Sequence, residues 1–131
     1  LMNYSGMSST LGLAFTHTGG LFPFFSPLLG WLGVFLTGSD TSSCALFGGM
    51  QKDTATAVGM SPELAVAANA SGGVTAKMIS PQSLSVATAA TNMVGQEGNL
   101  FRFTIGHSIA MTLVLCVLTY LQAGPLSFML P

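Results

Sequence analysis

The stretch Thr37-Gly38-Ser39-Asp40-Thr41-Ser42-Ser43 is a run of polar and small residues between two apolar segments. Before it, Ser26-Pro27 predicts a helix start, because serine is a favourable N-cap and proline suits the first helical position. A helix over residues 27–36 would be roughly 15 Å long, about half the hydrocarbon thickness of a bilayer. A second half-helix, capped at residue 39 or 40, is expected at 41–49. We therefore predict a re-entrant hairpin or a broken span over 21–49, with its polar tip near the middle of the membrane.

A second polar stretch, between residues 69 and 82, repeats this layout. The pairs Ser61-Pro62 and Ser80-Pro81 each predict a capped helix start. Between them, Ser71-Gly72-Gly73 predicts that the first helix breaks after about half a span. Non-helical backbone at membrane depth is tolerated only where it is buried in protein or lines a cavity. The pattern over 61–95 is therefore typical of a discontinuous span whose unwound middle contributes to the binding site of a transporter.

The remaining segments predict an all-α, multi-pass arrangement. We expect the end of a membrane helix at 1–20, surface loops at 50–60 and 96–102, and a last span at 103–131. Within the last segment, residues 103–121 are apolar and about long enough to cross a bilayer. The first residues resemble a chain entered midway, so we expect the C-terminal transmembrane part of a larger protein.

The composition excludes several functional classes. Charged residues make up 5% of the chain, against about 25% in soluble domains, and the mean hydropathy is +0.65. Because so few charged residues cannot cover the surface of a water-soluble domain, we expect the chain to lie in a lipid bilayer. The sequence has no basic patch that would indicate nucleic-acid binding. It also lacks the zinc, phosphate-loop, nucleophile-elbow and dinucleotide motifs, so we expect no enzyme activity, catalytic residue, metal or cofactor.

Both polar stretches offer groups that suit a small carboxylate. Helix N-termini bind anions through free N–H groups, and Ser, Thr, Asn and Gln add hydroxyl and amide groups. Asp40 is the expected proton carrier, because an acid inside a membrane is costly and usually functional; the alternative is a helix cap without a transport role. Lys77 is the expected partner of a substrate carboxylate or of Asp40; the alternative is a lysine that reaches the membrane interface. The expected substrate-binding residues are Ser39, Thr41, Ser42, Asn69, Ser71, Gly72, Gly73, Thr75, Lys77, Ser80 and Gln82.

Six long and uncommon motifs cover nearly the whole chain. They are MNYSGM (2–7), FPFFSP (22–27), GWLGVFLTGSDTSS (30–43), GGVT (72–75), KMISPQS (77–83) and LFRFT (100–104). In these motifs the chain resembles the C-terminal part of the bacterial L-lactate permease family. The resemblance implies a multi-pass protein of the bacterial inner membrane that imports L-lactate and related 2-hydroxy-monocarboxylates, such as glycolate, together with protons. It also implies a partner for this segment in the N-terminal part of the same permease.

A looser resemblance concerns architecture alone. Carriers of the wider ion-transporter superfamily use a re-entrant hairpin, a broken span and a final span in this order. The segments predicted here are similar to that order. The resemblance implies that polar tips of the hairpin and of the broken span meet near the membrane midplane.

Two other functions fit parts of the pattern. An anion channel or facilitator would use the same half-helix architecture, and uphill accumulation of substrate separates a carrier from it. Residues 37–40 are also superficially similar to the Gly-x-Gly-Asp motif of an intramembrane aspartyl protease, which needs two carboxylates around one water. The second aspartate of the chain, Asp53, falls in the expected loop 50–60. The protease alternative therefore needs a further membrane aspartate from outside this chain.

Overall fold

The described part of the chain is entirely helical. The computed structural model describes residues 5–6, 10, 21–124 and 128. Its helices are α2 (Phe22–Thr37), α3 (Asp40–Val58), α4 (Pro62–Lys77), α5 (Pro81–Ala90) and α6 (Glu97–Ala123), and no strand occurs among these residues. This confirms the predicted all-α class. The helix end expected at 1–20 and the end of the last expected segment lie largely outside the described residues.

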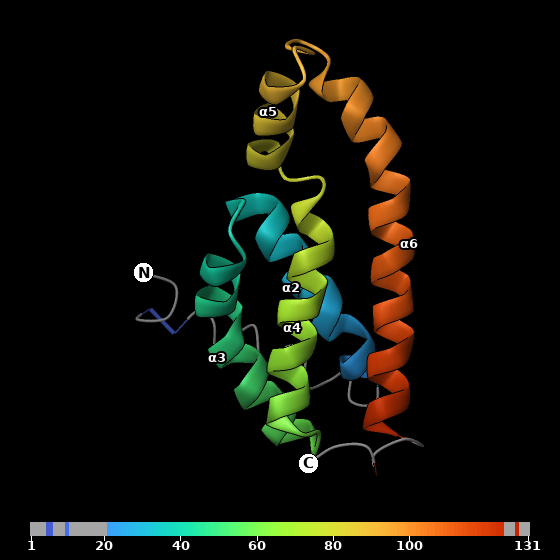
Figure 1. Cartoon of the computed structure of the whole chain (residues 1–131). Helices are drawn as coiled ribbons and strands as arrows, with labels where there is room; N and C mark the ends of the chain where they lie inside the picture. Colours follow the sequence, from blue (N-terminus) through green and yellow to red (C-terminus); the bar gives the residue numbers. More distant parts are fainter. Residues whose placement is uncertain (1–4, 7–9, 11–20, 125–127, 129–131) are drawn as a thin grey trace.

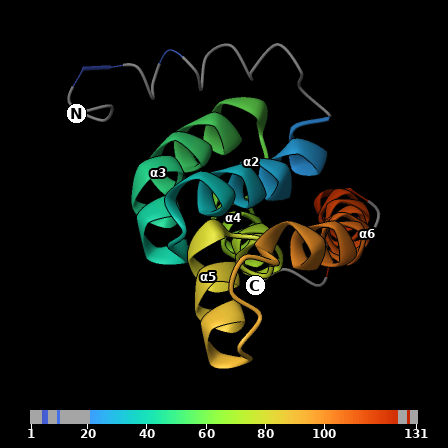
Figure 2. The same ribbon diagram turned by 90° about the horizontal axis from the view of Figure 1, so that it is seen from above.

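Helix α4 lies at the centre of the bundle. Helices α2 and α3 run antiparallel as a hairpin on one side of it, and α6 runs along another side (Figure 1). In the view from above, α2, α3 and α6 surround α4 (Figure 2). Helix α5 lies beyond the C-terminal end of α4 and packs against the first part of α6. The α4–α5 junction (residues 78–80) therefore lies beside the hairpin tip (residues 37–40), the turn that joins α2 to α3.

Small residues let α2 and α4 cross with their backbones in contact. Gly30 of α2 lies against the backbone of Asn69, and Gly72 of α4 lies against the backbone of Pro27. A methyl group at Gly72 would overlap the carbonyl oxygen of Pro27 and lie 2.7 Å from its carbonyl carbon. Membrane helices associate largely through close packing of this kind, because lipid provides little hydrophobic driving force between them. The crossing fixes the hairpin against the central helix.

The first arm of the hairpin begins earlier than predicted. Helix α2 starts at Phe22 with Pro23 in its first turn, so Pro27 lies inside the helix and Ser26 is not its cap. Pro23 satisfies the same preference for a first-turn proline that had pointed to Pro27. The hydroxyl of Ser26 is instead buried and forms hydrogen bonds with neighbouring helices.

The second arm also extends further than predicted. The expected half-helix 41–49 and most of the expected loop 50–60 form one helix, because α3 continues to Val58 and only residues 59 and 60 lie outside it. The polar residues of this segment indicated a loop, but Gln51 and Thr54 are buried between helices and not exposed to water. As a helix, α3 is roughly 28 Å long, close to the full hydrocarbon thickness of a bilayer and not half of it.

The predicted break at Ser71-Gly72-Gly73 is wrong, because α4 is continuous to Lys77. A glycine inside a helix costs about 1 kcal/mol relative to alanine, and close packing against α2 offsets this cost here. The helix breaks at residues 78–80 instead. Helix α5 then begins at the predicted Ser80-Pro81 start, where the Ser80 hydroxyl accepts a hydrogen bond of 3.3 Å from the backbone N–H of Ser83.

The turn before the last helix comes earlier than predicted. Helix α5 ends at Ala90, before the expected end at Gly95, and α6 begins at Glu97, inside the expected loop 96–102. Asn92 and Gly95 have positive φ angles of 56° and 90° and shape the turn. Within the described residues, α6 is the one helix that is long and apolar enough to cross a bilayer, with a mean hydropathy of 1.7 over an 18-residue stretch, and α2 is a shorter apolar helix.

Contacts with α6 set the height of the hairpin tip. The ring of Phe35, near the end of α2, lies 6.3 Å from that of Phe101, near the start of α6. The middle of α6, residue 110, is roughly 13 Å further along that helix. The hairpin tip therefore lies beside the first turns of α6 and not beside its middle.

Candidate functional site

The hairpin tip and the α4–α5 junction meet at one end of the hairpin. Gly38 ends α2 in the left-handed conformation, with a φ of 71°, and its carbonyl oxygen accepts a hydrogen bond from Nζ of Lys77. Lys77 also donates to Oε1 of Gln82 over 3.3 Å. A cation suits this position, because the C-terminal end of α2 carries partial negative charge. One lysine therefore connects three helices of the predicted site.

Asp40, the first residue of α3, lies between the hairpin tip and α4. Its Oδ1 is buried and has no hydrogen-bond partner among the described residues. This oxygen fits so closely against Gly73 that a methyl group there would overlap it and would lie 2.7 Å from a methyl carbon of Val34. A buried hydrogen-bond acceptor without a partner is unfavourable, so the position suits a bound group that donates a hydrogen bond to Oδ1. Asp40 is not the helix cap, because the Ser39 hydroxyl accepts the capping hydrogen bond from the backbone N–H of Ser42.

The same region holds further predicted residues. Thr41 and Ser42 are exposed on the first turn of α3, and Ser80 is buried at the start of α5. The N-termini of α3 and α5 both lie near Lys77, which contacts Gly38 before α3 and Gln82 in the first turn of α5. Among the described residues Lys77 forms no ion pair with Asp40, so the direct pairing considered for them is absent from this structure.

Some predicted residues of α4 lie away from the hairpin tip; they are Asn69, Ser71, Gly72 and Thr75. Ser71 is exposed, and its hydroxyl donates to the carbonyl of Ala67 in its own helix over 2.9 Å. Gly72 packs against α2, while Asn69 and Thr75 face other helices. Because α4 is continuous, residues that were predicted to share one unwound patch point in different directions. Of the α4 residues predicted, Gly73 and Lys77 reach the tip.

Thr75 belongs to a hydrogen-bonded group that joins α2, α4 and α6. Its hydroxyl shares a 2.7 Å hydrogen bond with that of Thr112, and its carbonyl accepts from the Ser108 hydroxyl over 2.7 Å. The indole N–H of Trp31 donates to the same serine over 2.9 Å. These groups are satisfied within the protein, so Thr75 supports packing and is not free to bind substrate in this state.

Sequence reasoning missed a buried amide group at the middle of the hairpin. The side chain of Gln51 is fully buried; it accepts from the Ser26 hydroxyl and donates to Oδ1 of Asn69 over 2.8 Å. The Asn69 amide in turn donates to Sγ of Cys44 over 3.5 Å, and the Ser26 hydroxyl contacts the Ala65 carbonyl at 3.0 Å. One cluster therefore holds α2, α3 and α4 together. No local signal marked this cluster, because Gln51 stands next to Lys52 and Asp53 in a polar stretch.

Replacing Gln51 by leucine should destabilise the protein by roughly 1–3 kcal/mol, because Asn69 and Ser26 would keep buried polar groups without partners. The measurement is the thermal unfolding midpoint of the purified full-length protein in detergent. Gln96→Leu is the control, since Gln96 is exposed and its side chain makes no capping bond. Equal midpoints for the two variants would contradict a stabilising role for the buried cluster.

The described residues give no support to metal or protease chemistry. No group of three or more His, Cys, Asp or Glu side chains that could hold a metal ion occurs among them. Asp53 lies within α3, and not in a loop as predicted, and is exposed. It is roughly 20 Å along the helix from Asp40. These two aspartates therefore cannot share one water.

A family model and several curated relatives match the chain. The family model described as L-lactate permease matches residues 1–125. The chain is 60% identical to the L-lactate permease of Bacillus subtilis (strain 168), over 98% of this chain and 23% of the relative. It is 60% identical to the L-lactate permease of Escherichia coli (strain K12), over 100% of this chain and 24% of the relative. It is 64% identical to the glycolate permease GlcA of Escherichia coli (strain K12), over 92% of this chain and 22% of the relative.

These alignments cover nearly all of the chain. The chain itself spans only about a quarter of the length of each relative. No solved structure matches it.

Proposed function

Since this chain belongs to the L-lactate permease family, we propose that it is the C-terminal part of a multi-pass permease of the bacterial inner membrane. The permease would import L-lactate or a related 2-hydroxy-monocarboxylate such as glycolate. Relatives named for L-lactate and for glycolate both align with most of the chain, which supports a substrate of this class. The family is one of permeases and not of enzymes. The all-helical structure and the apolar length of α6 agree with a membrane position.

The contact between the hairpin tip and the α4–α5 junction supports the assignment of this function to particular residues. The N-termini of α3 and α5 and the ammonium group of Lys77 lie together there. Helix N-termini and a cation attract a carboxylate. The exposed hydroxyls of Thr41 and Ser42 offer hydrogen bonds to the 2-hydroxyl group of such a substrate. We propose that the substrate carboxylate replaces the Gly38 carbonyl as the acceptor of Lys77.

We further propose that transport is coupled to protons through Asp40. Its buried Oδ1 lacks a hydrogen-bond donor among the described residues, and an acidic group inside a membrane protein is usually functional. Release of a proton from this carboxyl would leave a charge in a confined place beside Gly73. Binding and release of the proton would therefore change the packing between the hairpin tip and α4.

The proposal predicts that full-length permease in proteoliposomes accumulates radiolabelled L-lactate only when an inward proton gradient is imposed. Glycolate should compete with the label, whereas acetate, which lacks the 2-hydroxyl group, should compete weakly. The measured quantity is the ratio of internal to external lactate at steady state. A ratio of one with and without the gradient would indicate a facilitator or channel. Absence of flux would show that the substrate class is wrong.

A further inference from the structure

The free faces of α4 and α6 differ in chemistry. The free face of α6 carries large apolar side chains such as Leu113, Val114 and Leu118, and Val114 is 56% exposed. Such a surface matches lipid chains. The free face of α4 also exposes Val66 and Val74, but it carries the small side chains Ala67 and Ala70 between them at helical spacing. Small residues are enriched where membrane helices approach one another closely.

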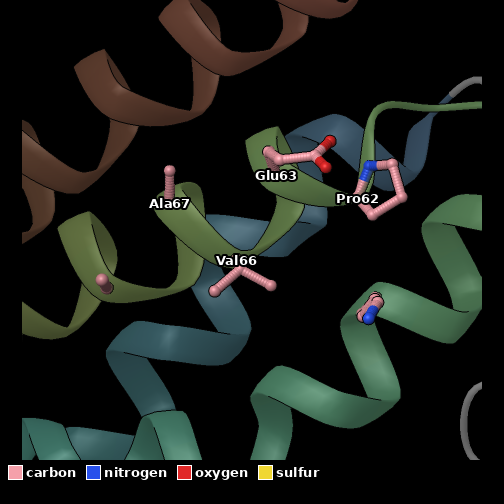
Figure 3. A pocket seen from close by; sticks show the side chains of 6 residues that line it. Pro62, Glu63, Val66 and Ala67 are labelled. Atoms are coloured by element: carbon pink, nitrogen blue, oxygen red, sulfur yellow. The ribbon is translucent and has the colours of Figure 1, made fainter.

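A groove runs along this face of α4. It has a volume of about 490 Å³ and is lined by Lys52, Pro62, Glu63, Val66, Ala67 and Ala70. Figure 3 shows the labelled side chains projecting from successive turns at the start of α4. The hydroxyl of Ser71, on the same face, is bonded to its own helix and adds little polarity.

Charged groups border only one end of the groove. Lys52 of α3 and Glu63 at the start of α4 lie there, and neither forms an ion pair with any residue that the structure describes. Charged side chains near the ends of membrane helices reach the water interface. The groove therefore runs from a polar rim into an apolar interior, as expected for the binding surface of a membrane-crossing helix.

We propose that this groove binds a transmembrane helix from the part of the permease that lies outside this chain. The proposal rests on the proposed function insofar as it takes the chain to be one part of a longer permease. The curated relatives are about four times as long as the chain, so about three quarters of a permease of that length lies outside it. The same face of α4 continues through the exposed Val74 to Lys77. A helix bound along it would therefore also border the candidate substrate site.

The test places single nitroxide spin labels on the full-length permease in proteoliposomes without substrate. Labels at cysteines introduced for Ala67 and Ala70 are compared with one at Leu118 on α6, after replacement of Cys44, Cys116 and any other cysteine. Labels in the groove should be immobilised and several-fold less accessible to oxygen and to a water-soluble nickel chelate. Oxygen accessibility equal to that at Leu118 would show that lipid fills the groove. High accessibility to the nickel chelate would show that water fills it. Either result would overturn the proposal.

A second pair of variants covers the case in which a label disturbs folding. Ala67→Leu should lower the thermal unfolding midpoint by several degrees, because added methyl groups overpack a helix interface. Val114→Leu, on the lipid-matching face of α6, should leave it unchanged. A neutral Ala67→Leu would overturn the proposal. Neither experiment requires transport, so failure here is distinguishable from failure of lactate uptake.

Discussion

Gly72→Ala is expected to remove most of the folded permease from the membrane. The added methyl group would overlap the carbonyl oxygen of Pro27 and lie 2.9 Å from its Cα atom. Both obstacles are backbone atoms, so no side chain can rotate away, and α2 and α4 have to separate. Overpacking of this kind costs about 1–3 kcal/mol and sometimes more. Gly30→Ala should behave alike, because its methyl group would meet the backbone of Asn69 in the same way.

Gly48→Ala provides the matched control for this prediction. Gly48 also lies inside a helix, but a methyl group added there would meet no atom of the described residues within 4 Å, apart from its chain neighbours and the backbone of its own helix. Alanine favours helices over glycine by about 1 kcal/mol, so this variant should keep or raise stability. The measurement is the yield of monodisperse permease in detergent, by size-exclusion chromatography, together with its unfolding midpoint. Equal behaviour of Gly72→Ala and Gly48→Ala would refute the close crossing of α2 and α4.

The sequence could predict those helix boundaries that depend on local chemistry. The start of α5 at Ser80-Pro81 and the end of α2 near Gly38 follow from capping and from the left-handed conformation that glycine favours. The same local rules failed at Ser26-Pro27, because Pro23 offers an equivalent start one turn earlier. Local signals therefore narrow the choice of boundaries but do not decide between two acceptable positions.

Other features depend on which helices pack together, and local sequence does not contain that information. Ser71-Gly72-Gly73 has the composition of a break, yet it forms helix because its glycines contact the backbone of α2. Gln51 lies in a polar stretch that is typical of a loop, yet its side chain is buried because Ser26 and Asn69 lie on facing helices. The expected site residues were therefore divided: Lys77 and Gln82 lie at the tip, whereas Asn69 supports the middle of the hairpin.

Asp40→Asn is expected to abolish uphill accumulation of lactate while preserving exchange of labelled for unlabelled lactate. Asparagine has nearly the same shape as a protonated aspartate and keeps the fit against Gly73, but it cannot release a proton. A carrier in which Asp40 transfers the proton should therefore become locked in the protonated-like state. In proteoliposomes with an inward proton gradient, the steady-state ratio of internal to external lactate should fall to about one.

Asp53→Asn tests whether this loss is specific, since Asp53 lies on the same helix but is exposed. It should accumulate lactate as the unmodified permease does. Continued accumulation by Asp40→Asn would show that another group carries the coupled proton. Loss of exchange together with accumulation, at a normal unfolding midpoint, would instead assign Asp40 to substrate binding, with its unpartnered oxygen reserved for the 2-hydroxyl group. Exchange without accumulation separates these two roles, because only proton coupling requires the carboxyl to change its charge during each transport cycle.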